Sequence, residues 1–127
     1  MLILSGKIVL VTGGARSGKS TFAEKYVAKV GNNITYIATA QVFDEEMRYR
    51  VGLHKSRRPS NWKCIEAPYL AEFAIENSAK SSDIILFDCL TLYVTNLLLS
   101  ENAPASIKER YHYVKEAVER IIEVKYR

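Results

Sequence analysis

Short apolar runs alternate with amphipathic stretches along this chain. Residues 7–12, 34–39 and 83–88 are aliphatic and β-branched runs bounded by polar residues, which is typical of strands buried on both faces. Residues 62–66 are a candidate for a shorter strand. Because these strands are separated by helical patterns, the order predicts an α/β fold, with a mostly parallel sheet flanked by helices.

The helices between the predicted strands carry their own start and stop signals. Residues 19–30 place apolar side chains at helical spacing, and Gly31 follows where a helix would end. Asp44 can cap a second helix, and Ser106 with Glu109 forms a capping box before a last amphipathic helix. We also expect a short helix after residue 70 and a very apolar one over residues 90–100.

Length and composition favour one ordinary globular domain over residues 1–127. Hydrophobic residues make up 48% of the chain and charged residues 25%. No apolar run is long enough to span a membrane, and the N-terminus lacks the layout of a signal peptide, so we expect a cytoplasmic protein. Cys64 and Cys89 have no metal-ligand spacing, and we interpret them as reduced thiols.

The charge balance points to an anionic partner without identifying it. The formal net charge is +4 and the isoelectric point is about 9.1, which suits phosphate esters as well as nucleic acid. Basic residues cluster over residues 48–59. Taken alone, such a cluster is more simply a solvated face.

A phosphate-binding loop follows the first predicted strand. Gly13, four residues and then Gly18, Lys19 and Ser20 form the P-loop pattern between a strand and a helix. Glycines let backbone N–H groups approach phosphate oxygens closely, and the helix start adds its positive end. The nucleotide-binding residues expected here are Gly13, Gly14, Ala15, Arg16, Ser17, Gly18, Lys19 and Ser20.

The same loop predicts a magnesium ion and a nucleoside triphosphate, ATP or GTP. Lys19 would neutralise the outer phosphates during catalysis, and the Ser20 hydroxyl can ligate Mg²⁺. Asp88 ends a predicted buried strand and is the natural second metal ligand. The alternative is a chance match in a Gly-rich loop. The loop does not decide between hydrolysis, kinase transfer and switching.

The P-loop and three further stretches occur in the order and spacing of one family: "LVTGGARSGKS", "YIATAQVFDEEMRYRV", "HKSRRPSNW" and "DCLTLYVTNLL". The sequence resembles the bifunctional adenosylcobinamide kinase / adenosylcobinamide-phosphate guanylyltransferase of cobalamin biosynthesis up to about Leu99. The resemblance implies a RecA-like P-loop fold and a homo-oligomer, a trimer in the family. It also implies two reactions: phosphorylation of adenosylcobinamide, and transfer of GMP from GTP through a guanylyl-histidine to form adenosylcobinamide-GDP.

The family's histidine corresponds to His54. A neutral imidazole is a competent nucleophile at phosphorus near neutral pH. Lys55, Ser56, Arg57 and Arg58 would then contact the nucleotide, and the cations would stabilise charge on the transferred phosphate. Without the resemblance, His54 is more simply a helix-end histidine with no chemistry.

The resemblance carries over less firmly to other positions. Thr39, Ala40 and Gln41 follow the second strand where the family contacts nucleotide, although an ordinary loop is the alternative. Glu66 matches a family glutamate and could bind guanine or ribose, or be a surface acid. Asn96 matches a family asparagine, with a helix-to-loop hydrogen bond as its alternative.

Family members continue past the stretch that matches this chain, so residues 1–127 correspond to the N-terminal part of the family's domain. In RecA-type sheets a later strand inserts between the P-loop strand and the aspartate-bearing strand. We therefore expect an incomplete sheet with a gap at that place. A nucleotide-binding protein without turnover stays open as an alternative. A RecA-like ATPase acting on nucleic acid is weaker, because no basic-aromatic platform is present.

Overall fold

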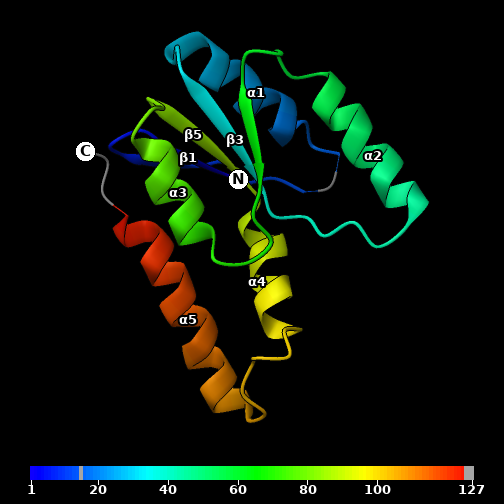
Figure 1. The fold of residues 1–127 in the computed structure, drawn as a ribbon, viewed down its shortest axis with the longest axis vertical. Helices are drawn as coiled ribbons and strands as arrows, with labels where there is room; N and C mark the ends of the chain where they lie inside the picture. The colour runs from blue at the N-terminus through cyan, green and yellow to red at the C-terminus, as the bar shows by residue number, and fades with distance from the viewer. Residues whose placement is uncertain (15, 125–127) are drawn as a thin grey trace.

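The computed structural model describes residues 1–14 and 16–124 and contains one five-stranded sheet between layers of helices (Figure 1). The strands are β1 (Leu2–Leu4), β2 (Ile8–Leu10), β3 (Ile34–Ala38), β4 (Lys63–Glu66) and β5 (Ile84–Asp88). The helices are α1 (Lys19–Val30), α2 (Glu45–Ser56), α3 (Ala71–Ala79), α4 (Leu90–Leu98) and α5 (Ile107–Glu123). The predicted α/β class is confirmed.

The sheet order is β2-β1-β5-β3-β4, and its two halves differ in direction. Strand β3 pairs parallel with both β5 and β4, as the alternation of strands and helices predicts. Strand β1 pairs antiparallel with both β2 and β5. Therefore β2 and β5 run in the same direction, with one strand between them.

Strand β1 corrects the expected gap in the sheet. The place between the P-loop strand and the strand that ends in Asp88 is filled by Leu2–Leu4, a segment that the sequence pattern left unassigned. The three residues are fully buried, since both faces of β1 are covered. The backbone groups of β1 and β5 are paired with each other, so the described sheet has no break in its middle.

A second expectation was wrong for the same reason. We expected residues 7–12 to form a strand buried on both faces, but β2 is an edge strand. Its side chains Ile8 and Leu10 are 46% and 59% exposed. The apolar run over residues 7–12 therefore does not indicate a central strand. It belongs to an edge strand on which the side chains of Ile8 and Leu10 are exposed.

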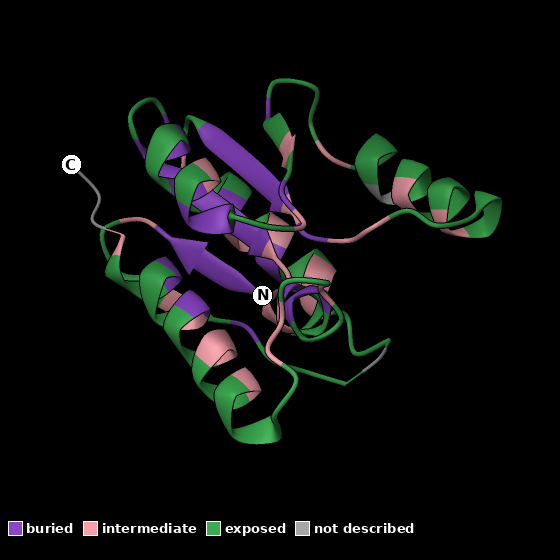
Figure 2. Cartoon of the chain, turned by 60° about the horizontal axis from the view of Figure 1, so that its bottom comes forward, coloured by how far each residue is buried: buried purple, intermediate pink, exposed green. Residues whose placement is uncertain are grey.

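Two apolar cores lie on opposite faces of the sheet. Helix α1 packs Ala23 and Val27 against one face, and both side chains are completely buried. Helices α3, α4 and α5 cover the other face, with Tyr93 and Ile121 among their buried side chains. Helix α2 belongs to neither core: Figure 2 shows it standing away from the sheet, and no described residue of α2 is buried.

The predicted helix boundaries are confirmed by their hydrogen bonds. The Asp44 carboxylate accepts from the Met47 N–H at 2.7 Å at the start of α2, and Ser106 Oγ accepts from the Glu109 N–H at 3.1 Å at the start of α5. Gly31 ends α1, and its N–H donates to the Val27 carbonyl. Among the described helices, none is long and apolar enough to cross a membrane.

Candidate functional site

The P-loop connects β2 to α1 and has the backbone conformation that its glycines permit. Gly18 has φ of +84°, in the left-handed region that favours glycine. A Cβ at position 13 would overlap the Ser17 hydroxyl, so this side chain would have to shift if the residue at position 13 were larger. Lys19 Nζ donates to the Gly13 carbonyl oxygen at 3.1 Å, which places the ammonium group over the loop. Ala15 lies outside the described residues.

The register of the sheet brings this loop and Asp88 to the same edge. Leu10 of β2 and Phe87 of β5 both pair with Leu2 of the intervening strand. The chain therefore leaves β2 toward the P-loop, and β5 at Asp88, at the same level across the sheet. With strands spaced by about 4.8 Å, the two strand ends lie roughly 10 Å apart.

Asp88 is half-buried, and Tyr36 of β3 donates a hydrogen bond from its hydroxyl to the Asp88 carboxylate. Burial, followed by the charge of Asp88, raises the pKa of Tyr36 well above its usual range. The phenol therefore keeps its proton and remains a donor at neutral pH. This bond fixes one oxygen of Asp88 and leaves the other available for a ligand.

The donor chemistry of this edge fits magnesium. Ser20, in the first turn of α1, offers a hydroxyl, and Asp88 offers a carboxylate. Magnesium prefers oxygen ligands and takes only one or two from the protein when phosphates and waters supply the rest. The part of the chain that the structure describes has no group of three or more His, Cys, Asp and Glu side chains arranged to hold a metal.

The basic segment at the end of α2 reaches the P-loop. Arg57 lines a cavity of about 310 Å³ together with Arg16, Lys19 and Ser20. The guanidinium carbon of Arg58 lies 3.7 Å from the centre of the Tyr36 ring, close to the P-loop side of the sheet. The fold therefore joins two motifs that are separated by more than 35 positions in the sequence.

The other residues of this segment are at the surface. Lys55 and Ser56 are exposed at the end of α2, and Ser56 Oγ donates to the Leu53 carbonyl at 2.8 Å. His54 lies in α2, one turn before Arg58, but its side chain is outside the described part of the structure. Arg50, earlier in α2, pairs with Glu46 on an exposed face, so it is part of the solvated surface.

Thr39 and Asn96 form a structural junction at the same edge. Thr39 is completely buried, and its hydroxyl donates to the Cys89 carbonyl at 2.8 Å and accepts from the Cys89 N–H at 3.0 Å. Asn96 Nδ2 donates to the Thr39 carbonyl at 2.7 Å and to the Pro68 carbonyl at 3.1 Å. These bonds tie the ends of β3 and β5 to α4, which is the helix-to-loop alternative considered for Asn96.

The remaining predicted contacts lie around this junction. Ala40 and Gln41 are half-buried just beyond the end of β3. Glu66 is exposed at the end of β4, and its Cα pairs in register with Ala38 of β3, which in turn pairs with Asp88. All of these positions therefore lie at the sheet edge that carries the P-loop.

A larger cavity of about 750 Å³ opens beside Gln41. Its wall combines polar groups with large, mostly apolar side chains, and the latter include Phe43, Met47, Tyr69 and Leu92. Phe43 is 79% exposed, so a bound molecule could cover much of its surface. The volume is within the range of cavities that bind cofactor-sized ligands.

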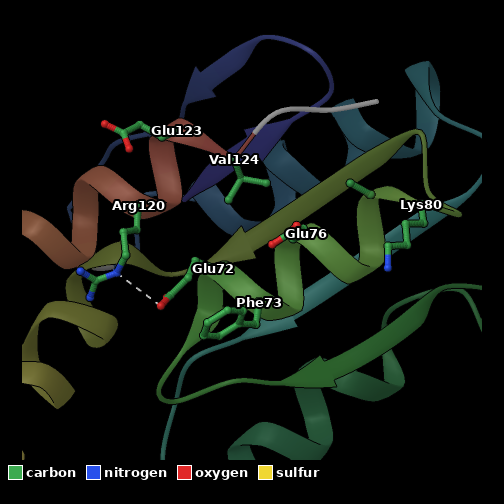
Figure 3. Close-up of a pocket in the computed structure, with 8 residues that line it drawn as sticks. Glu72, Phe73, Glu76, Lys80, Arg120, Glu123 and Val124 are labelled. Atoms are coloured by element: carbon green, nitrogen blue, oxygen red, sulfur yellow. Dashed lines mark ion pairs between the residues drawn. The ribbon is translucent and has the colours of Figure 1, made fainter.

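A second cavity, of about 420 Å³, lies between α3 and α5 (Figure 3) and shares Glu72 and Arg120 with the wall of the 750 Å³ cavity. Arg120 reaches from α5 to Glu72 on α3, with Nε 3.4 Å from the carboxylate. Tyr93 also donates to this buried carboxylate at 3.3 Å. Because these helices cover the face of the sheet opposite to α1, we interpret the Glu72–Arg120 pair as an interhelical contact rather than part of the phosphate site.

Tyr36 is the member of this site that sequence reasoning missed. It stands within the quoted "YIATAQ" stretch, but nothing local shows that its hydroxyl meets Asp88, 52 positions later. The available signal was weak: a tyrosine in a buried strand needs a partner for its hydroxyl. The strand pairing, which brings Tyr36 beside Leu86 in neighbouring β5, decides which partner it finds.

Comparisons with known proteins agree on one family. A family model described as cobinamide kinase / cobinamide phosphate guanyltransferase matches residues 9–125. The bifunctional adenosylcobalamin biosynthesis protein CobP of Pseudomonas aeruginosa is 45% identical over 93 residues, which cover 73% of this chain and 54% of that protein. CobU of Salmonella typhimurium is 40% identical over 119 residues, covering 91% of this chain and 62% of that protein.

A third relative, CobU of Escherichia coli, is 40% identical over 91 residues, which cover 72% of this chain and half of that protein. The matched parts thus span 50% to 62% of the length of these curated relatives.

Proposed function

Because the chain belongs to the cobinamide kinase / cobinamide phosphate guanyltransferase family, we propose that it transfers phosphoryl and guanylyl groups to a corrinoid. Three parts of the chain carry the proposal: the P-loop, Asp88 at the same edge of the sheet, and the basic segment after α2. The single most informative observation is that Arg57 lines one cavity with Lys19 and Ser20. This shared cavity shows that the segment of His54 lies beside the phosphate loop.

In the kinase reaction, the hydroxyl of adenosylcobinamide attacks the γ-phosphorus of ATP or GTP. The bond to the β-phosphate oxygen breaks, the hydroxyl proton leaves, and adenosylcobinamide phosphate and a nucleoside diphosphate result. Lys19 and the P-loop N–H groups hold the phosphates, with Ser20 and Asp88 as the protein ligands of Mg²⁺. Bound Mg²⁺ supplies neutralisation of the phosphate charge.

In the guanylyl transfer, an imidazole nitrogen of His54 attacks the α-phosphorus of GTP and pyrophosphate leaves. The phosphate of adenosylcobinamide phosphate then attacks the guanylyl-histidine. The P–N bond breaks, adenosylcobinamide-GDP forms, and His54 is free again. Arg57 lines the P-loop cavity, so its positive charge is well placed to stabilise the transferred phosphate.

We place the corrinoid acceptor in the 750 Å³ cavity beside Gln41. A corrin ring is broad and largely apolar with polar amide arms, and the cavity combines Phe43, Tyr69 and Leu92 with polar groups. Gln41 follows β3 at the same sheet edge as Asp88, so the acceptor would lie toward the nucleotide. This placement rests on the chemistry of the lining.

We also propose that the protein forms a homo-oligomer. Strand β2 is a sheet edge with Ile8 and Leu10 exposed, and an apolar edge of this kind is a surface that soluble proteins usually cover. The mass of the protein in solution, measured by light scattering, tests this expectation. A monomer at micromolar concentration would contradict it.

The function is tested by intact-mass spectrometry after incubation with GTP and Mg²⁺. We expect a guanylyl mass increase in the natural chain, its loss in His54→Ala, and its retention in His112→Ala. His112 is a suitable control because it is the other histidine and is exposed on α5. An adduct that survives His54→Ala would contradict the proposed nucleophile.

The alternative to catalysis by this chain is nucleotide binding without turnover. In that case GTP binds in a magnesium-dependent manner, but neither an adduct nor a phosphorylated corrinoid forms. Detectable adenosylcobinamide phosphate from the 127-residue chain would exclude this function.

A further inference from the structure

Tyr36 contacts both halves of the candidate site through different parts of its side chain. Its hydroxyl donates to the Asp88 carboxylate at the end of β5. Its ring faces the Arg58 guanidinium, with 3.7 Å between the guanidinium carbon and the ring centre. Asp88 belongs to the proposed metal site, whereas Arg58 follows the helix that carries His54.

The surroundings hold Tyr36 firmly in this position. The side chain is buried among Ile84, Leu86 and Trp62, and β3 pairs with strands on both sides. A phenol in such a place has little rotational freedom, because close-packed neighbours fix its ring. The two contacts of Tyr36 therefore have a rigid common support.

Arg58 anchors α2, which is otherwise an exposed helix. No described residue of α2 is buried, so apolar packing contributes little to the position of this helix. Arg58 follows two residues after the end of α2, and its guanidinium lies against the Tyr36 ring. Its Nε and Nη1 atoms are buried and have no hydrogen-bond partner. A planar guanidinium stacks on an aromatic ring as no lysine can. The Trp62 N–H donates to the Pro59 carbonyl at 3.2 Å, and buried Trp62 closes the segment.

We propose that Tyr36 is a positioning residue that holds the metal-binding carboxylate and the histidine-bearing segment in one fixed relation. The hydroxyl orients Asp88 for Mg²⁺, and the ring receives Arg58 and so places α2 beside the P-loop. This inference extends the proposed function, because it names the side chain through which the two transfer sites are joined. Its tests measure nucleotide affinity and the protection of backbone amides from hydrogen exchange. They can therefore be interpreted even if the chain transfers no guanylyl group.

The first test removes only the hydroxyl. Tyr36→Phe keeps the ring and loses the bond to Asp88, so we expect a fluorescent GTP analogue to bind five- to tenfold more weakly in Mg²⁺ and unchanged in EDTA. Tyr26→Phe is the matched control, since Tyr26 packs on the same core from α1 and makes no described contact with Asp88. Equal affinities for Tyr36→Phe and the natural chain in Mg²⁺, or an equal loss in Mg²⁺ and EDTA, would overturn the metal half of the proposal.

The second test removes the stacked cation. In Arg58→Gln we expect amide hydrogen exchange of α2 to rise by at least tenfold, while exchange in α1 stays as in the natural chain. Arg58→Lys should show most of the same increase, because charge alone does not replace a stacked guanidinium. Arg48→Gln, on the exposed surface of α2, is the control. Unchanged exchange in α2 of Arg58→Gln would overturn the attachment, whether or not the chain transfers GMP.

Discussion

Helices α1 and α2 both serve the candidate site, but they are held in different ways. Helix α1 buries Ala23 and Val27 against the sheet, and its first residues complete the P-loop. Helix α2 has the same length of 12 residues, yet none of its described residues is buried. The phosphate cradle is therefore fixed by a core, whereas the histidine segment depends on a few contacts at its end.

This difference matches the proposed roles of the two helices. A P-loop binds phosphate through preset backbone N–H groups, so its supporting helix gains from rigid packing. In the proposed reaction, His54 must meet the α-phosphorus of GTP and then the corrinoid phosphate. Anchoring α2 at one end through Arg58 leaves most of the helix surface free to be covered by substrate or by another polypeptide.

The strongest test of the contrast places a charge in each helix. Val27→Asp puts an unpaired carboxylate in a core with no exposed surface, and we expect it to cost at least about 4 kcal/mol and unfold the protein. Val51→Asp, at a half-buried position of the largely exposed helix α2, should cost less than about 1 kcal/mol. Urea denaturation followed by circular dichroism measures both.

If Val27→Asp cannot be purified, Val27→Ala serves in its place, with an expected loss of about 1–3 kcal/mol from removed apolar contacts. Similar losses at positions 27 and 51 would show that α2 is packed as firmly as α1, which would contradict the comparison.

The next largest difference is expected in GTP affinity, which should fall on substitution in α1 but not on substitution in α2. Lys19→Ala removes the ammonium group over the P-loop, and we expect GTP to bind about 100-fold more weakly, since a charged hydrogen bond contributes about 2–3 kcal/mol. Lys29→Ala, in the last turn of the same helix, is the control.

In the same titration, His54→Ala should keep its GTP affinity within about threefold, because a nucleophile acts on bound nucleotide and need not contribute to its affinity. A large loss in His54→Ala would mean that α2 is part of the binding cradle itself.

The proposed acceptor cavity extends the contrast to the second substrate. Phe43→Ser removes an exposed apolar side chain before α2, and we expect the KM for adenosylcobinamide to rise about tenfold, in line with about 1.5 kcal/mol for covering a phenyl group. The GTP affinity should not change. Phe73→Ser, in the cavity between α3 and α5, is the control, and an equal effect there would place the acceptor elsewhere.

The smallest effect on stability is expected for Asp83, which precedes β5 and binds the loop that follows α1. Asp83 accepts from the Asn33 N–H at 2.8 Å and from the Asn32 N–H at 3.1 Å, and these bonds, led by that of Asn32, lower the pKa of its carboxyl. Because the carboxyl is exposed, Asp83→Asn should cost no more than about 1 kcal/mol at pH 7.

The sign of the pH dependence follows from the lowered pKa of Asp83. Its contribution is complete above the unfolded pKa of about 3.9 and is lost as the pH falls through the lower folded pKa. The difference in unfolding free energy between the natural chain and Asp83→Asn should therefore narrow below about pH 4. A constant or widening difference in urea melts would contradict this account.

Local signals in the sequence predict most of the helices and strands and the position of the P-loop. Helix α1, its end at Gly31, strands β3 and β5 and the caps at Asp44 and Ser106 all follow from signals within a few residues. The P-loop could be predicted for the same reason, because its glycines and its lysine are needed at fixed spacing for backbone geometry. Such signals need no knowledge of distant partners.

The spatial neighbours of each strand and side chain, in contrast, could be known only from the tertiary structure. Strand β1 has three residues, too few for a period to be visible, and its place follows from pairing with β5 more than 80 positions away. The same pairing made β2 an edge strand, and the packing of the segment after α2 gave Tyr36 both Asp88 and Arg58 as partners. These outcomes depend on contacts between segments far apart in the chain, because an apolar run specifies burial but not the neighbour that provides it.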